Sequence, residues 1–365
     1  MKVLLIATTK FELDGITNVI MNYYRSIDKK DIEFDFVVPN EINDSLKSEI
    51  QSNSSNVYVL KGRMKKPFKY INELSKIIKN NEYDVVHAHG NSHTLALEMI
   101  AAKKGKAKVR IPHSHNSTCK YKTIHKLLTY SFNKNYTLGF ACGEKAGKWL
   151  YGNKPFIVIN NGINIEKFQY NETVRNEIRK KYGFENCKVV LHIGHFTYQK
   201  NHEYLIDIFS ELFKTNKNYR LFLLGDGPLK KEVQEKVNRL KLNNVIIFTG
   251  KTPDAHKFLQ AADLFLMPSR YEGLPLTLIE AQSAGLPCFV SSNVSKEAAL
   301  TDLVKFIDLE NSPKDWAEII NSEVINDRNL ITEKVTSEIR KKGYDIKENA
   351  KFLKNIYFTE AGKII

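Results

Sequence analysis

Ala262–Ser292 reads ADLFLMPSRYEGLPLTLIEAQSAGLPCFVSS, and this stretch decides the fold class. Leu264–Met267 is a short unbroken apolar run bounded by turn residues, which is typical of a strand covered on both faces of a parallel sheet. Because proline is favoured in a first helical turn, a helix is expected to begin near Pro275 and to end at Gly285. A second strand is expected at Cys288–Val290. The stretch therefore predicts a strand, loop, helix, strand unit.

The loop before this helix predicts a binding site for an anion. A helix N-terminus offers unpaired amides and a positive dipole end, and Gly273 and Leu274 bring bare backbone close to it. Thr277 and Glu280 are three residues apart and share one helical face, while Glu272 lies before the helix. Two carboxylates would repel a phosphate that they met directly, so hydroxyl groups beside the phosphate are their better partners. A nucleotide sugar has this layout.

The pattern P-S-x-x-E-G-L-P-x-x-x-x-E-A-x-x-x-G-x-P begins at Pro268. It resembles the E-x7-E region of the retaining glycosyltransferases of family 4, whose GT-B fold has two facing Rossmann-like domains. The resemblance implies that Glu272 contacts the transferred sugar and Glu280 the ribose of the donor. It also implies that the backbone and side chains around the helix start bind the donor, namely Gly273, Leu274, Pro275, Leu276 and Thr277.

A second loop, Gly194–Asn201 with the sequence GHFTYQKN, follows the strand expected at Lys188–Ile193. Ligands bind at this edge of open α/β sheets. The family usually has Gly-Arg in the first two positions and a later lysine, which together hold the diphosphate. Gly194 and Lys200 match that pattern, and His195 replaces the arginine. A lysine can neutralise a leaving diphosphate, whereas an imidazole does so only when it is protonated.

The first half of the chain carries two H-x-H pairs at the ends of expected strands, His87 with His89 and His113 with His115. Alternate residues of an extended segment point the same way, as in a metal site, but no further ligand group follows, so hydrogen-bonded histidines are the better interpretation. The family resemblance implies that a histidine here touches the transferred sugar; His115 aligns best, with His113 as the fallback.

Other features of the first half carry the resemblance further. The pair Asp14-Gly15 stands where the family has a glycine-rich loop near the donor phosphate. Only Gly15 matches that loop, so the resemblance implies a donor-binding role for Gly15 alone. The segments HSHN and GEKAGKWLYG resemble the exopolysaccharide and capsule branch of the family. No D-x-D loop is present, so no metal and no other cofactor are expected.

Strands and helices alternate along the whole chain, which predicts two doubly wound parallel sheets. We expect a first domain at residues 1–165, a second, nucleotide-sugar-binding domain at 166–345, and a last segment at 346–365. The polar stretch from Asn160 to about Tyr170 is expected to be a linker, and the chain beyond Leu300 to be mostly helical. The last segment includes a helix at Lys347–Tyr357, which the resemblance implies crosses back to the first domain.

Length and composition limit the class of protein. The 365 residues are enough for two cores, and no apolar run reaches the length of a membrane span. The N-terminal run MKVLLIATT is too short for the core of a signal peptide. The four cysteines have no C-x-x-C spacing, which favours a reducing cytoplasm and argues against a zinc site.

The net charge of +14 points to an anionic partner. No Asp or Glu occurs between Ala101 and Asn135, where many lysines accompany the apolar residues Ile124, Leu127, Leu128 and Phe132 and the flanking Tyr121 and Tyr130. One interpretation is a helix that lies on an anionic membrane surface; the other is a helix whose apolar stripe packs on its own sheet. Nucleic acid is not expected as a partner, because no recognition motif accompanies the charge.

Taken together, these features predict a metal-independent retaining glycosyltransferase. It would move a hexose or N-acetylhexosamine from a nucleoside diphosphate, expected to be UDP, to a hydroxyl of a bacterial cell-surface glycan intermediate that is expected to be lipid-linked. Glu272, His115 and Lys200 are the expected catalytic residues. Two alternatives stay open: a nucleotide-sugar epimerase or hydrolase of the same fold, and a nucleotide-sugar-binding protein without turnover.

Overall fold

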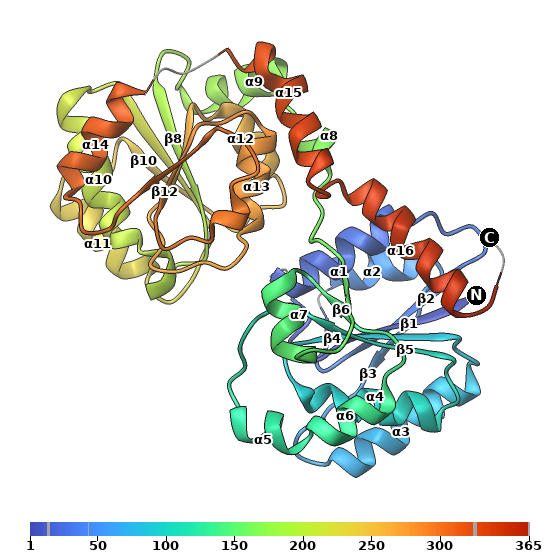
Figure 1. Cartoon of the computed structure of the whole chain (residues 1–365). Coiled ribbons are helices and arrows are strands. Elements are labelled where there is room, and N and C mark those ends of the chain that lie inside the picture. The colour runs from blue at the N-terminus through green and yellow to red at the C-terminus, as the bar shows by residue number, and fades with distance from the viewer. Residues whose placement is uncertain (13–14, 43, 324–326, 364–365) are drawn as a thin grey trace. The chain divides into compact units, whose positions relative to one another are not determined.

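The computed structural model describes residues 1–12, 15–42, 44–323 and 327–363. The chain forms two compact units, of which unit 1 comprises residues 1–162 and 343–365 and unit 2 comprises residues 163–342 (Figure 1). Each unit is a parallel sheet with helices on both faces. The α/β fold class expected from the sequence is confirmed. No helix in the described ranges is long and apolar enough to span a membrane.

Unit 1 contains a seven-stranded parallel sheet. Across the sheet the strands are β3 (Val57–Val59), β2 (Glu33–Val38), β1 (Lys2–Ala7), β4 (Val85–Gly90), β5 (Val109–Ser114), β6 (Phe140–Ala141) and β7 (Ile157–Val158). The strand order reverses between β1 and β4, so that a crevice is expected at their carboxyl ends. The central strands β1 and β4 are almost wholly buried, which explains the apolar run of β1 and places the two histidines of β4 inside the unit.

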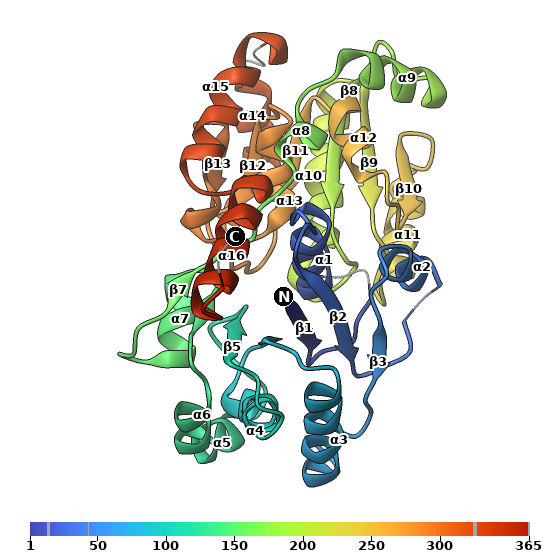
Figure 2. The ribbon, with the colours of Figure 1, turned by 90° about the vertical axis from the view of Figure 1, so that its right-hand side faces the viewer.

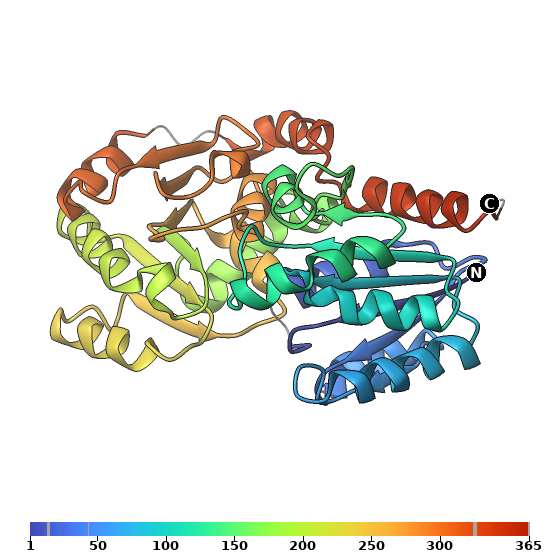
Figure 3. The ribbon, with the colours of Figure 1, turned by 60° about the horizontal axis from the view of Figure 1, so that its bottom comes forward.

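Two layers of helices cover the sheet of unit 1. Figure 2 shows one face with α3 (Pro67–Asn80), α4 (Ala96–Lys104) and α6 (Thr129–Asn135). Figure 3 shows α16 (Ile346–Glu360) on the opposite face, which also carries α1 (Gly15–Ser26) and α2 (Asp44–Ser52). The remaining helices of this unit are η1 (His93–Leu95), α5 (Lys122–Leu127) and α7 (Glu144–Tyr151).

The C-terminal helix α16 belongs to unit 1 although 180 residues of unit 2 precede it in the chain. It packs against α1, and Lys354 in α16 pairs with Asp28 at 2.9 Å. Beyond the helix, Lys363 pairs with Asp84 at 2.7 Å. The expected boundaries at 165 and 345 lie within three residues of the boundaries of the compact units.

Unit 2 repeats this topology with a six-stranded parallel sheet. Across the sheet the strands are β10 (Ile246–Gly250), β9 (Tyr219–Leu224), β8 (Lys188–Ile193), β11 (Leu264–Met267), β12 (Cys288–Ser291) and β13 (Val304–Ile307). The order reverses between β8 and β11. These are the strands that precede the two loops singled out in the sequence.

The sheet of unit 2 also lies between two helical layers (Figure 1). One layer contains α10 (His202–Thr215), α11 (Lys230–Arg239) and α14 (Pro313–Ser322). The other contains α8 (Ile165–Phe168), α9 (Glu172–Tyr182), α12 (Ala255–Ala261), α13 (Leu276–Ser283) and α15 (Arg328–Lys341). Two short 3-10 turns, η2 (Tyr198–Lys200) and η3 (Lys296–Ala298), complete the unit.

The structure corrects several expectations. The region beyond Leu300 is mostly helical, as expected, but it also contains the edge strand β13, which was not predicted because its short, half-exposed segment VKFI lacks an unbroken apolar run. The expected linker contains the one-turn helix α8, capped by Asn164. The basic helix is two short helices, α5 and α6, which meet at Leu128. Within the basic region Phe132 is fully buried in the core, as the interpretation of an apolar stripe packed on its own sheet requires, whereas Leu127 is 76% exposed.

Candidate functional site

Lys200 and Glu272 meet at the carboxyl edge of the sheet of unit 2. Lys200 follows β8, Glu272 follows β11, and the order of the strands reverses between these two. Lys200 Nζ lies 2.6 Å from Glu272 Oε1, and the two side chains are only 16% and 9% exposed. Ligands bind at this position in open α/β sheets. The structure therefore brings together two residues that lie 72 positions apart in the sequence.

Backbone and side-chain contacts hold the two loops to each other. Gln199 Nε2 donates to Glu272 Oε2 and to the carbonyl oxygen of Tyr271, each at 3.1 Å, and the Arg270 amide donates to the Gln199 carbonyl at 2.8 Å. The Asn201 side chain donates to the carbonyl oxygen of Pro268 at 3.0 Å. These contacts fix the Glu272 carboxylate beside Lys200.

Helix α13 begins next to this pair. Its N-cap residue is Pro275, and no side-chain hydrogen bond caps the helix in the part of the chain that the structure describes. The Thr277 hydroxyl is buried, and no described residue forms a hydrogen bond with its Oγ1. An uncapped helix start with a buried, unpartnered hydroxyl is suited to a phosphate oxygen, which accepts hydrogen bonds from both. Leu274 and Leu276 flank Pro275, and a side chain added at Gly273 would meet open space.

Glu280 lies one turn further along α13 and is partly buried. Burial raises the pKa of its carboxyl to about 7, and the opposing attraction of Lys167 is smaller. A carboxyl with this pKa is divided between its charged and neutral forms near neutral pH. The charged form accepts hydrogen bonds from two hydroxyl groups, as a ribose would require.

The start of the β8–α10 loop is packed too closely for a side chain at Gly194. A Cβ at this position would lie 2.8 Å from Nε2 of His192 and 3.2 Å from Cδ of Lys200. Gly225 in the neighbouring loop has a φ of +138°, and a Cβ there would lie 2.0 Å from the Gly194 carbonyl oxygen. His195, in contrast, is exposed to solvent.

Unit 1 places the four histidines of the H-x-H pairs together at the ends of β4 and β5. His87 Nε2 lies 3.0 Å from His113 Nδ1, and His89 Nδ1 lies 2.9 Å from His115 Nε2. Burial lowers the pKa of all four imidazoles, to about 3 for His87 and His115, so the group is uncharged at neutral pH. The prediction that these histidines are hydrogen-bonded is confirmed.

The ring geometry of the histidines differs from that of a preformed metal site, although ring nitrogens of His87, His89 and His113 lie within 4.8 Å of one another. The His87 and His113 rings are 5.2 Å apart and inclined by 8°, so their nitrogens face each other edge to edge across the hydrogen bond. A nitrogen that is engaged in this way directs its lone pair or proton at its neighbour and not at a shared ion.

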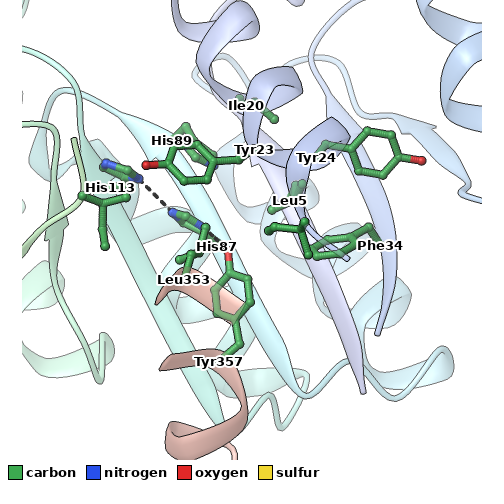
Figure 4. A pocket seen from close by; sticks show the side chains of 12 residues that line it. Leu5, Ile20, Tyr23, Tyr24, Phe34, His87, His89, His113, Leu353 and Tyr357 are labelled. Atoms are coloured by element: carbon green, nitrogen blue, oxygen red, sulfur yellow. Dashed lines mark hydrogen bonds between the residues drawn. The ribbon is translucent and has the colours of Figure 1, made fainter. Parts of the chain in front are cut away.

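A small pocket adjoins the histidines in unit 1 (Figure 4). It is lined by His87, His89, His113, Tyr23 and Tyr357 together with apolar side chains, and its volume is about 10 Å³. This is room for about one water molecule.

Gly15 is the exposed first residue of α1, and Asp14 before it lies outside the described residues.

Sequence reasoning missed Gln199, His192 and Tyr357. His192 stands two residues before Gly194, and the period of two in a strand could have placed it on the same side. Gln199 looks like an ordinary loop residue, and its contact with Glu272 depends on the folded loop. Tyr357 is 270 residues from His87, to which it is hydrogen-bonded at 2.6 Å, and no local pattern indicates that contact.

The two halves of the chain match two families of known proteins. Residues 13–167 match the family described as Glycosyltransferase Family 4, and residues 174–345 match Glycosyl transferases group 1. The chain is 31% identical to the glycosyltransferase named EpsF of Bacillus subtilis (strain 168), over 94% of this chain and 93% of that protein.

A more distant relative is the UDP-Gal:alpha-D-GlcNAc-diphosphoundecaprenol alpha-1,3-galactosyltransferase of Escherichia coli. It is 26% identical over 80% of this chain and 79% of its own length. The fold resembles that of Anabaena HepE in complex with UDP-glucose, with a TM-score of 0.76 and 17% identity over 98% of this chain and 99% of HepE. The expectation from the sequence motifs is confirmed: the chain belongs to the family 4 glycosyltransferases.

Proposed function

We propose that the protein is a retaining glycosyltransferase that uses a nucleoside diphosphate sugar, with UDP as the nucleotide, and acts on a lipid-linked intermediate of a bacterial cell-surface glycan. The observation that carries the proposal is the Lys200–Glu272 pair beside the uncapped start of α13, at the switch point of the sheet. The name of the Escherichia coli relative specifies a UDP-sugar and a diphosphoundecaprenol acceptor, which supports both substrates.

The chemistry that we assign to this site begins with the leaving group. Lys200 neutralises the departing diphosphate, and the amides of Leu276 and Thr277 donate to its oxygens. In unit 2, Glu272 orients the sugar and Glu280 accepts from the ribose. In unit 1, His115 is assigned to a hydroxyl group of a sugar. His195 adds a second cation when it is protonated.

The configuration of the anomeric carbon is retained if the acceptor hydroxyl attacks this carbon on the same face from which the phosphate leaves. The bond from carbon to the acceptor oxygen forms as the bond from carbon to the phosphate oxygen breaks, and the acceptor proton passes to the leaving phosphate. No covalent nucleophile is required, and Lys200 with the helix amides supplies the charge stabilisation that a metal ion would otherwise supply. We therefore expect chelators to leave the activity unchanged.

The test is an incubation with labelled nucleotide sugars, with and without lipid extracted from bacterial membranes, followed by identification of the products. Sugar transfer that depends on lipid supports the proposal. A free or altered sugar without lipid would assign the chain to a hydrolase or an epimerase, and binding without any product would assign it a role without turnover. Lys200→Ala is the control for contaminating activity.

We also propose that unit 1 contacts an anionic membrane surface at the cytoplasmic face. Large apolar side chains are exposed on two segments, Met64 and Phe68 before and at the start of α3, and Tyr121, Leu127 and Tyr130 on and beside α5 and α6. Lysines accompany both segments, and Lys120 and Lys134 lie over the rings of Tyr121 and Tyr130. Exposed apolar groups among cations suit a lipid interface.

Both segments are attached to the same turn of unit 1. Arg63 binds Glu98 at the start of α4 through two hydrogen bonds of 2.7 Å and also donates to the Thr94 carbonyl. His125 of α5 stacks on His93, with the ring centres 3.9 Å apart, and its Nδ1 accepts from the His93 amide. The two segments therefore contact the same part of unit 1, the turn at η1 and the start of α4.

Vesicle flotation tests this contact. The protein is expected to float with vesicles that contain about a third phosphatidylglycerol and not with pure phosphatidylcholine, and less in high salt. Leu127→Ser with Tyr130→Ser should reduce flotation, whereas Leu330→Ser, a change at an equally exposed leucine of unit 2, should not. Equal flotation of all variants would exclude the assigned surface.

A further inference from the structure

The four histidines of unit 1 form two hydrogen-bonded pairs that are stacked on each other. Each pair meets edge to edge, His87 with His113 and His89 with His115, at ring separations of 5.2 and 5.1 Å. Across the pairs, His87 stacks on His89 and His113 on His115, both with ring centres 4.2 Å apart. Since the imidazoles are neutral, each pair shares one N–H between its two facing nitrogens, and the tautomers within a pair are coupled.

Among the described residues, a side chain outside the four histidines binds a ring nitrogen of only one pair. Tyr357 of α16 is fully buried, and its hydroxyl lies 2.6 Å from the outer nitrogen of His87, Nδ1 (Figure 4). Burial raises the pKa of the phenol well above its usual value, so it keeps its proton. In the described part of the chain the nitrogens at the other ends, Nε2 of His113, Nε2 of His89 and Nδ1 of His115, are buried and have no partner.

The phenol determines the direction of the hydrogen bonds in its pair. The Tyr357 O–H donates to His87 Nδ1, because the hydroxyl would otherwise bury its proton without an acceptor. His87 then carries its proton on Nε2 and donates to His113 Nδ1. His113 in turn carries its proton on Nε2, where the structure shows no acceptor. The described residues offer no such group to the His89–His115 pair, and either direction of its hydrogen bond is allowed.

We propose that Tyr357 is a positioning residue that acts through His87 to present the His113 Nε2–H as a hydrogen-bond donor to an oxygen of the sugar substrate. A buried N–H without a partner is costly, which is consistent with a ligand oxygen that completes the chain of hydrogen bonds. The pocket next to the histidines holds about one water molecule, so the ligand is assigned to the carboxyl ends of β4 and β5. The inference rests on the proposed function for the nature of this ligand.

The tautomers can be measured independently of activity. In protein labelled with ¹⁵N-histidine, with resonances assigned by single His→Gln variants, His87 and His113 should both show the Nε2–H form. His89 and His115 should show a mixture of tautomers. In Tyr357→Phe the first pair should lose its single tautomer. Tyr24→Phe is the matched control, because the Tyr24 hydroxyl binds Ser55 and the Ile50 carbonyl and points away from the histidines (Figure 4).

Kinetics test the consequence for the substrate. Tyr357→Phe should lower kcat/KM for the sugar donor by about 3- to 10-fold, while the Kd for UDP, which lacks the sugar, stays unchanged. If Tyr357 acts only through His87, its loss should add nothing to the effect of His87→Leu. A purely structural role would instead lower Tm and give additive effects.

Failure of the Tyr357 inference and failure of the proposed function give different experimental results. Unchanged tautomers in Tyr357→Phe would overturn the relay whether or not the protein transfers sugar. An altered tautomer with unchanged kcat/KM would overturn the contact between His113 and the sugar. If the protein transfers no sugar at all, the proposed function fails, and the Kd of an intact UDP-sugar replaces kcat/KM in the same comparison.

Discussion

The two sheet edges of this protein share a topology and differ in chemistry. In both units the strand order reverses beside the first strand of the sheet, between β1 and β4 in unit 1 and between β8 and β11 in unit 2. The edge of unit 1 carries four neutral histidines that bind one another. The edge of unit 2 carries an ion pair, Lys200 with Glu272, beside an open helix start.

This difference separates what the fold supplies from what the side chains supply. A doubly wound sheet provides a crevice at the same place in both units. Neutral imidazoles offer single hydrogen bonds, which suit hydroxyl groups, whereas a cation and helix amides suit phosphate. The pair in unit 2 also implies a competition, because a phosphate that binds Lys200 must share the lysine with Glu272.

The largest effect is expected from Lys200→Ala, which tests whether unit 2 supplies the charge for the reaction. Loss of a cation at the leaving diphosphate should lower kcat by about 10²- to 10³-fold. The variant also leaves the partly buried Glu272 without its partner, so Tm is measured alongside. Lys305→Ala is the control, because Lys305 forms an exposed ion pair with Glu323 in the same unit. An activity within twofold of the original would contradict the assignment.

Glu272→Gln tests the competition for Lys200. Transfer should fall by about 10-fold or more, because the neutral amide orients the sugar less well. The affinity for UDP should instead rise about 2- to 10-fold, since Lys200 no longer has to break an ion pair with a carboxylate before it binds the phosphate. Isothermal titration with UDP and steady-state kinetics separate the two effects. Weaker binding of UDP by this variant would show that Glu272 and Lys200 do not compete in this way.

Glu280 should make donor binding depend on pH. Its pKa of about 7 in the folded chain means that the carboxyl gains a proton as the pH falls through 7, and the Kd for UDP should rise about 5- to 10-fold between pH 8 and pH 6. Glu280→Gln should remove this dependence and bind UDP weakly at both pH values. Equal losses of UDP affinity and transfer in Glu272→Ala and Glu280→Ala would mean that the two roles are wrongly assigned.

The same pKa makes a prediction for stability. Folding raises the pKa of Glu280 above its ordinary value of 4.5, so the folded chain gains stability from the protonated form. That stability is complete below the ordinary pKa and is lost as the pH rises through about 7. Glu280→Gln should therefore raise Tm at pH 8, by about 2–4 °C if the gain is about 1 kcal/mol. A lower Tm for this variant at pH 8 would contradict the cost assigned to the buried charge.

The smallest effect is expected from His195→Arg. An arginine at this exposed loop position carries its charge at every accessible pH and offers a planar fork of donors to a phosphate, so transfer should increase by about 2- to 5-fold at pH 8. The measurement is kcat/KM from pH 6 to pH 9. A profile identical to that of the original protein would show that His195 does not contact the phosphate.

Local sequence patterns determined most of the fold. The apolar runs at Lys188–Ile193 and Leu264–Met267 are strands with these bounds. Glu172–Tyr182 is a helix as predicted, because an N-cap asparagine and a following glycine define its ends. Periodicity missed β13, since a half-exposed edge strand of four residues lacks the signal of a buried one.

The sequence by itself also indicated the residues that we propose for the donor site, because the motif around Glu272 and the loop around Lys200 are continuous segments that follow buried strands. Only the tertiary structure decided how these residues are paired. The Lys200–Glu272 contact spans 72 residues, and the Tyr357–His87 contact spans 270. Such pairings depend on which strands become neighbours and on where the last helix packs. Both are decided by how the whole unit buries its apolar surface, and the local periodicity and spacing of residues do not encode them.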